Sequence, residues 1–69
     1  MNIKQKVEWL LAHCEDCRND DLHLVQHYWS KFGKTNTESI RRSRARIQND
    51  EEMYPPTDPF VKTIRDRKK

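Results

Sequence analysis

The chain has 69 residues, of which 36% are charged and 33% are apolar, and its formal net charge is +3. This length allows one domain and excludes both a multidomain architecture and a large enzyme core. No apolar run approaches the roughly 20 residues of a membrane span, and no signal-like apolar stretch follows the first residues. We therefore expect one soluble, cytoplasmic domain over residues 1–69, without a membrane partner.

The first expected helix covers residues 3–13. Ile3, Val7, Leu10 and Cys14 recur at helical spacing on one face. The polar stretch 14–18 then interrupts this pattern, and we expect it to be a connection without regular structure.

The second expected helix covers residues 20–32 and is the most apolar of the chain. Asn19 is its predicted N-cap, because a side-chain oxygen there can accept a hydrogen bond from the first turn. Gly33 is expected to end the helix, since glycine readily adopts positive φ. The predicted buried stripe consists of Leu22, Val25, Trp29 and Phe32, widened by Leu24 and Tyr28.

The third expected helix covers residues 36–49. Thr35 and Glu38 match a capping box at its start. Ile40 and Ile47 form a narrow apolar seam, and a broad basic surface remains on the other side. This helix is therefore expected to dock through the seam and to present arginines outward.

Residues 50–58 are expected to form a linker, and residues 59–69 a short helix or an extended basic tail. Phe60, Val61 and Ile64 would dock this last segment on the bundle. No strand pattern is present. The predicted fold is thus all-α: a three-helix bundle of the helix-turn-helix type over about 3–49, followed by a short C-terminal helix or tail.

The charges gather in blocks along the chain. Residues 31–47 carry a net charge of +5 and residues 61–69 one of +4, whereas residues 1–30 and 48–60 carry −2 and −4. Two basic blocks favour an anionic partner, most often a nucleic acid. The alternative is a solvated helix face followed by a charged tail.

Two helices joined by a short glycine-containing turn, the second rich in arginine, are typical of a helix-turn-helix. In that motif the second helix enters the major groove of double-stranded DNA, where arginine binds guanine and phosphate. Polar residues at its N-terminus can bind a backbone phosphate. The predicted DNA contacts are Lys34, Thr35, Asn36, Thr37, Arg41, Arg42, Arg44 and Arg46.

Cysteine and histidine form a second constellation, Cys14-x-x-Cys17 followed by His23-x-x-x-His27. These residue types suit tetrahedral zinc. The five residues between Cys17 and His23 are far fewer than zinc fingers use. We therefore interpret them as reduced thiols, one facing the core, and exposed histidines. No metal or cofactor is expected, and zinc at these four residues is the alternative.

Catalysis is not expected. The chain has no glycine-rich phosphate loop, no nucleophile motif and no second domain to form a cleft. Asp20 and Asp21 are better explained as acids at the start of a helix than as an acid–base pair.

Residues 37–49, with the Tyr-Pro-Pro-Thr-Asp-Pro stretch 54–59 and Val61, resemble the C-terminal half of small phage and prophage open reading frames. Residues 18–21 resemble the acidic start of the middle helix in that group. The resemblance implies a phage origin and a helix-turn-helix-like, DNA-binding fold in which residues 37–49 form the recognition helix.

The expected function is therefore that of a small phage-encoded DNA-binding protein in the host cytoplasm, a transcriptional regulator or an accessory factor. A homodimer is expected if binding is sequence-specific, because one small module contacts little DNA. The alternative is a small phage protein that binds and inhibits or redirects a host protein. That function would use exposed aromatic anchors, with Trp9, Tyr28 and Tyr54 as candidates.

Overall fold

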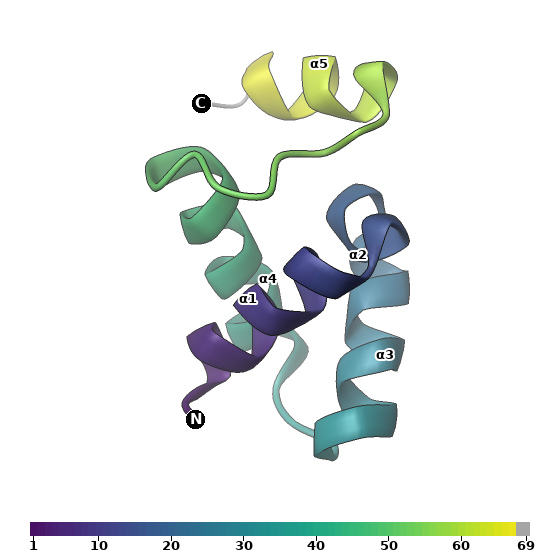
Figure 1. Cartoon of the computed structure of the whole chain (residues 1–69), viewed down its shortest axis with the longest axis vertical. Helices are drawn as coiled ribbons and strands as arrows, with labels where there is room; N and C mark the ends of the chain where they lie inside the picture. Colours follow the sequence, from purple (N-terminus) through teal and green to yellow (C-terminus); the bar gives the residue numbers. More distant parts are fainter. Residues whose placement is uncertain (68–69) are drawn as a thin grey trace.

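The computed structural model describes residues 1–67 and contains helices but no strand within that range (Figure 1). The predicted all-α class is confirmed. Within the same range no helix could cross a membrane, since the longest has 12 residues and a span needs about 20. The elements are α1 (Ile3–His13), α2 (Glu15–Asn19), α3 (Asp21–Phe32), α4 (Thr37–Ala45), the π-helical turn η1 (Arg46–Asp50) and α5 (Pro59–Arg67).

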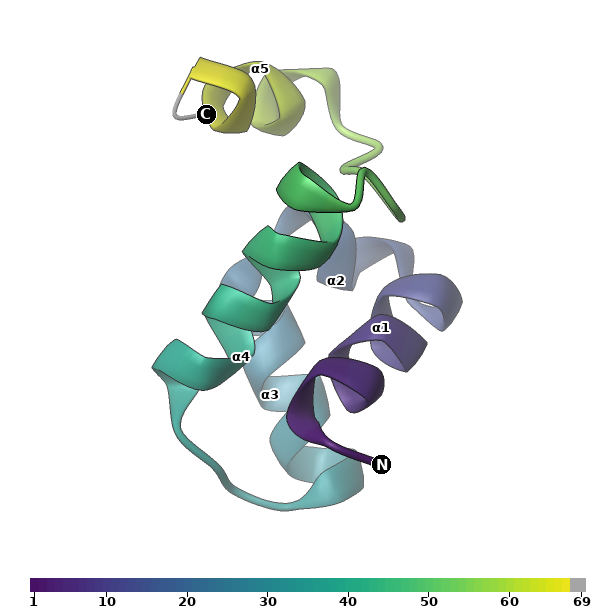
Figure 2. The same cartoon turned by 90° about the vertical axis from the view of Figure 1, so that its left-hand side faces the viewer.

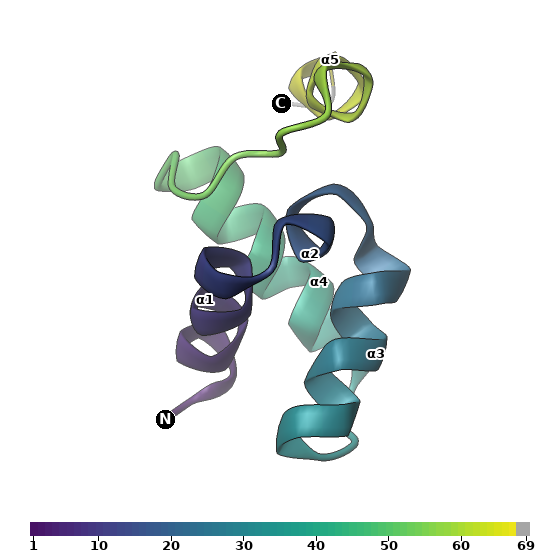
Figure 3. The ribbon, with the colours of Figure 1, turned by 45° about the vertical axis from the view of Figure 1, so that its right-hand side comes forward.

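Helix α1 begins and ends where the periodicity predicts. The Asn2 side chain accepts a hydrogen bond from the Gln5 backbone N–H at 2.8 Å, and the Gln5 side chain accepts one from the Asn2 N–H at 2.9 Å. This reciprocal capping box satisfies two of the donors that a helix N-terminus leaves free. The helix then crosses over α4 (Figures 1 and 3).

The stretch 14–18 was expected to lack regular structure, and this was wrong. Residues Glu15–Asn19 form the short helix α2, which lies at the corner between α1 and α3 (Figure 3). Its single turn gives no apolar periodicity that a sequence pattern could reveal. Two acids in its first turn, Glu15 and Asp16, favour the helix through its dipole.

The N-cap of α3 is Asp20, not Asn19. The Asp20 carboxylate accepts a hydrogen bond from the Leu22 N–H at 2.9 Å. Asn19 instead accepts from the N–H groups of Thr57 and Asp58 at 2.9 and 3.1 Å. A polar residue suited to capping is thus used to hold the distant linker against the bundle.

The third expected helix is divided into two parts in the structure. After α4, the backbone widens into the π-helical turn η1, where the Glu51 N–H donates to the carbonyl of Arg46 at 3.1 Å. The helix ends as Glu52 and Tyr54 adopt positive φ values of 54° and 47°. Neither residue is glycine, so composition gave no signal for this turn. Figure 2 shows the loop 33–36 that joins α3 to α4.

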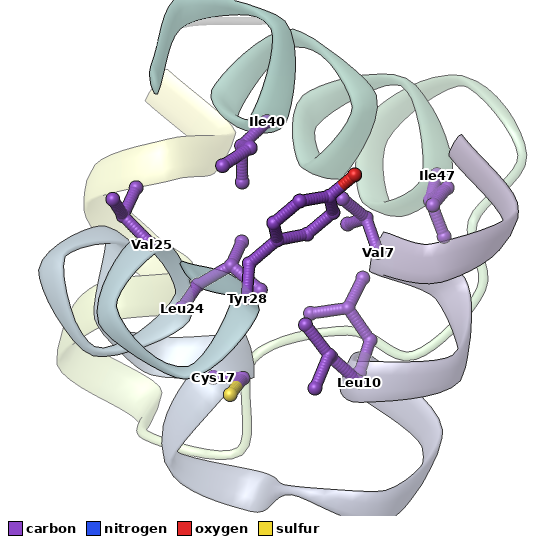
Figure 4. Close-up of a cluster of buried hydrophobic side chains, with 9 residues drawn as sticks. Val7, Leu10, Cys17, Leu24, Val25, Tyr28, Ile40 and Ile47 are labelled. Atoms are coloured by element: carbon purple, nitrogen blue, oxygen red, sulfur yellow. The ribbon is translucent and has the colours of Figure 1, made fainter. Parts of the chain in front are cut away.

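Side chains from α1, α2, α3, α4 and η1 meet in one core (Figure 4). Leu24, Val25 and Tyr28 are the buried residues of α3, whereas Leu22 is 64% exposed. The predicted stripe therefore lay part of a helical turn away from the face that is buried in the structure. Including Trp29 and Phe32 had placed the centre of the stripe too far towards their side of the helix. Other buried apolar residues are Val7, Leu10, Leu11, Cys17, Ile40 and Ile47.

Helix α5 was expected to dock through Phe60, Val61 and Ile64, and this was wrong for two of them. Phe60 is 73% exposed and Ile64 is 40% exposed. A polar residue holds the helix instead: the Arg65 guanidinium donates to the carbonyl of Arg18 and to the side-chain oxygen of Gln48. The helix lies at one end of the molecule, outside the bundle formed by the other helices (Figure 1).

Two neighbouring leucines test the position of the core. Leu24→Ala should reduce the free energy of unfolding by about 2–5 kcal/mol, because it opens a cavity in a fully buried site. Leu22→Ala changes the same atoms on the same helix and should alter that free energy by less than about 0.5 kcal/mol. Urea unfolding followed by circular dichroism measures both. A larger loss of unfolding free energy for Leu22→Ala than for Leu24→Ala would contradict the observed orientation of α3, in which Leu24 is buried and Leu22 is exposed.

Candidate nucleic-acid interface and metal centre

The start of α4 differs by one residue from the prediction. Asn36, not Thr35, is the N-cap, and its side-chain oxygen accepts from the N–H groups of Glu38 and Ser39 at 2.8 and 3.3 Å. The Thr35 carbonyl instead accepts a hydrogen bond from the Trp29 indole N–H at 3.0 Å. Asn36 therefore already occupies the backbone donors that were expected to bind a phosphate, whereas Thr37 remains exposed.

Three of the predicted arginines lie on the outside of α4 and η1. The side chains of Arg41 and Arg42 are 57% and 80% exposed, and Arg46 is exposed as well. Glu38 forms ion pairs with Arg41 and Arg42 at 3.7 and 3.4 Å. Such exposed pairs contribute little free energy, so these guanidinium groups remain available to an anionic ligand.

Arg44 was predicted to contact DNA, but the structure places it inside the protein. Its side chain is only 10% exposed and donates two hydrogen bonds to the Asp21 carboxylate, at 2.8 and 3.2 Å. It also donates to the side-chain oxygen of Gln48 at 3.4 Å. A guanidinium that is desolvated and paired in this bidentate way is not available to a phosphate.

Lys34 lies in the loop before α4, with its ammonium group 5.3 Å from the centre of the Trp29 ring. The residue is exposed. It is thus positioned beside the N-terminus of α4 by a cation–π contact and can still reach an anion.

A buried polar network next to this face was missed by sequence reasoning. Gln48 donates to the carbonyls of Arg18 and Tyr54 at 3.2 and 2.8 Å, and accepts from Arg44 and Arg65. Burial lowers the pKa of the Arg65 guanidinium, and the nearby charge of Arg44 lowers it further. The available signal was the spacing of Arg44 and Gln48, four residues apart on one helical face.

The structure brings Cys14, Cys17, His23 and His27 together, and the two histidines are half-buried rather than exposed as expected. Their ligand atoms all lie within 4.8 Å of one another. Cys14 Sγ is 3.6 Å from His23 Nε2, and Cys17 Sγ is 3.5 Å from His27 Nδ1. The unpredicted helix α2 explains the close approach, since it carries Cys17 and packs against α3, which carries both histidines.

His13, the remaining histidine, lies outside this cluster. Its ring stacks on that of Trp9, with 4.2 Å between the ring centres. Its Nδ1 atom is 2.8 Å from the carbonyl of Trp9. It therefore takes no part in the convergence of the other two histidines with the cysteines.

A thiol beside an imidazole is also the arrangement of a catalytic nucleophile, which requires a readily ionised thiol. Burial raises the pKa of the Cys17 thiol to about 12, and its contact with Cys14 and the negative charge of Asp16 act in the same direction. The thiol of Cys17 thus stays neutral at pH 7 when no metal is bound. The raised pKa of this thiol does not favour a role as a catalytic nucleophile.

Comparison of the chain with protein-family models, curated proteins and solved structures gives no match. A function must therefore be proposed from the chemistry of its own residues.

Two acids that pair with arginines of α4 test which pairs stabilise the fold. Asp21→Asn should reduce the free energy of unfolding by about 2 kcal/mol, because it leaves the buried Arg44 charge without a carboxylate. Glu38→Gln removes only exposed pairs and a favourable helix-dipole contact, and should cost less than about 1 kcal/mol. Chemical unfolding measures both variants. Equal losses would contradict the assignment of Asp21 as the central partner.

Proposed function

We propose that the protein binds double-stranded DNA through the outward face of α4 and η1. The observation that carries this proposal is the exposure of Arg41, Arg42 and Arg46 on one continuous helical surface. At about 100° per residue, the three positions span an arc of about 140°. An α-helix with such a face fits the major groove, where arginine can bind both guanine and phosphate.

The connection between α3 and α4 supports a helix-turn-helix-like mode of binding. Residues 33–36 join the two helices (Figure 2). Gly33 ends α3 and has a φ of 100°. In this mode α4 is the recognition helix, while α3 supports it through the Asp21–Arg44 pair. The resemblance of residues 37–49 to phage proteins of this kind points in the same direction. The protein would act as a regulator or accessory factor, as a dimer where binding is sequence-specific.

Glu38 lies between the arginines on this face and competes with DNA for them. On binding, Arg41 and Arg42 would exchange a weak pair with Glu38 for contacts with phosphate. This exchange has a measurable consequence, because removal of the Glu38 charge should tighten binding rather than weaken it.

A second candidate function is the binding of a partner protein. Two of the aromatic anchors expected for it are engaged internally: Tyr28 is only 2% exposed, and Arg18 lies 5.4 Å from the centre of the Tyr54 ring. Trp9, 37% exposed, is covered in part by His13 and Lys31. Phe60 on α5 is the observation in favour, since this large apolar side chain is 73% exposed.

Fluorescence anisotropy with a duplex of mixed sequence, at two salt concentrations, tests DNA binding. The affinity should fall steeply with salt, with a log–log slope of about 0.9 per phosphate contacted. Replacing Arg41, Arg42 and Arg46 together by Gln should reduce that slope by up to about 3 and weaken binding at low salt. Glu38→Gln should strengthen binding.

A matched control removes the same charge from elsewhere. Lys4, Lys6 and Lys31 lie on α1 and α3, and their joint replacement by Gln changes the net charge equally. This variant should retain most of the affinity. Greater loss in the control than in the arginine variant would refute the assignment to α4. Absence of duplex binding at low salt would refute DNA binding itself and favour the protein partner.

A further inference from the structure

We propose that Cys14, Cys17, His23 and His27 bind one Zn²⁺ ion in a closed structural site. The four side chains come from three adjoining parts of the chain: the corner between α1 and α2, the middle of α2, and two successive turns of α3. Sequence spacing alone argued against this site, and the convergence of the four ligand atoms within 4.8 Å argues for it.

The distances agree with tetrahedral zinc. With about 2.3 Å from zinc to sulfur and about 2.0–2.1 Å to nitrogen, a tetrahedral site separates a sulfur from a nitrogen by about 3.5 Å. Two sulfur–nitrogen distances are 3.5 and 3.6 Å. No two ligand atoms are more than 4.8 Å apart. The edges of a tetrahedral site run from about 3.3 Å between two nitrogens to about 3.8 Å between two sulfurs, so no pair has to close by more than about 1.5 Å, which rotation of side chains can supply.

The donor set also selects the metal. Two thiolates and two imidazoles are ligands for zinc rather than for magnesium or calcium, which prefer oxygen. His23 presents Nε2 to the cluster and His27 presents Nδ1. Each of these nitrogens must be unprotonated to bind metal, so His23 would carry its proton on Nδ1 and His27 on Nε2. With four protein ligands the site has no open position, which makes it structural rather than catalytic.

Hydrogen bonds between thiol and imidazole could also hold each cysteine beside a histidine. They would not explain why both pairs gather at the same point. This helix has five residues and its N-cap, Cys14, makes no side-chain capping bond. A helix of this length is not stable alone in water. Zinc bound at both ends of the Cys14–Cys17 turn and to α3 would add to the stabilisation that the buried Cys17 and the hydrogen bonds to the Arg18 carbonyl already provide.

The first experiment uses the metal alone and the whole chain. Protein purified without chelator should contain one zinc per chain by elemental analysis. Titration of metal-free protein with Co²⁺ should give the visible absorption bands of a tetrahedral thiolate–imidazole centre, saturating at one equivalent and lost on addition of Zn²⁺. Zinc below 0.1 per chain together with no tetrahedral cobalt spectrum would overturn the proposal.

Ligand variants locate the site. Cys14→Ser and His27→Ala should each weaken zinc binding by at least about 100-fold, more than loss of a residue that only orients a ligand. His13→Ala is the matched control and should bind zinc as the unaltered protein does. Unchanged affinity in Cys14→Ser, or equal loss in His13→Ala, would show zinc bound elsewhere on the surface and overturn the assignment.

Thermal melting gives a readout that does not require variants to fold. Chelation of zinc should lower the Tm of the unaltered protein by at least about 10 °C, and addition of one equivalent of Zn²⁺ should restore it. A Tm that is the same with and without chelator would contradict a structural role. None of these measurements involves DNA, so the zinc site and the proposed DNA binding can fail independently.

Discussion

The buried pair of Arg44 and Asp21 determines how α4 sits on the bundle. Burying a guanidinium is costly unless its donors are satisfied, and here the carboxylate of α3 and the side chain of Gln48 satisfy them. Among residues 1–67 no buried side-chain nitrogen or oxygen lacks a partner. With Arg44 and the two isoleucines turned inward, helical periodicity leaves Arg41, Arg42 and Arg46 outside. Asp21 thus holds Arg44 inside through two short hydrogen bonds, whereas its contact with Arg41, at 3.7 Å, is longer and leaves that guanidinium at the surface.

The same polar centre explains why α5 is attached without an apolar core of its own. Arg65 reaches the side chain of Gln48, and Asn19 holds the backbone of Thr57 and Asp58. These bonds fix direction but bury little apolar area, so α5 should detach from the bundle more readily than the other helices separate from one another. Its exposed Phe60 belongs to this loosely attached end of the molecule.

Much of the helical framework could be predicted because apolar periodicity, and the glycine that ends α3, are local signals. The bounds of α1 match, and α3 and α4 begin within one residue of the expected positions. Three features could not be predicted. Helix α2 is too short to show a period, the inward direction of Arg44 depends on a carboxylate 23 positions away, and α5 docks through one arginine. Each depends on contacts between distant residues, which hydrophobicity along the chain does not encode.

The Cys–His cluster lies at α2 and α3, whereas the basic face lies on α4 and η1. The two candidate sites are therefore on different helices. The buried apolar residues number nine in the described part, a small core for the five helical segments that contribute to it. A metal linking α2 to α3 would hold the scaffold on which Asp21 fixes Arg44, without touching the outward arginines. Loss of the proposed zinc should therefore affect the proposed DNA binding only through the fold. The affinity of the remaining folded fraction should be unchanged, whereas a metal that contacted DNA directly would change that affinity itself.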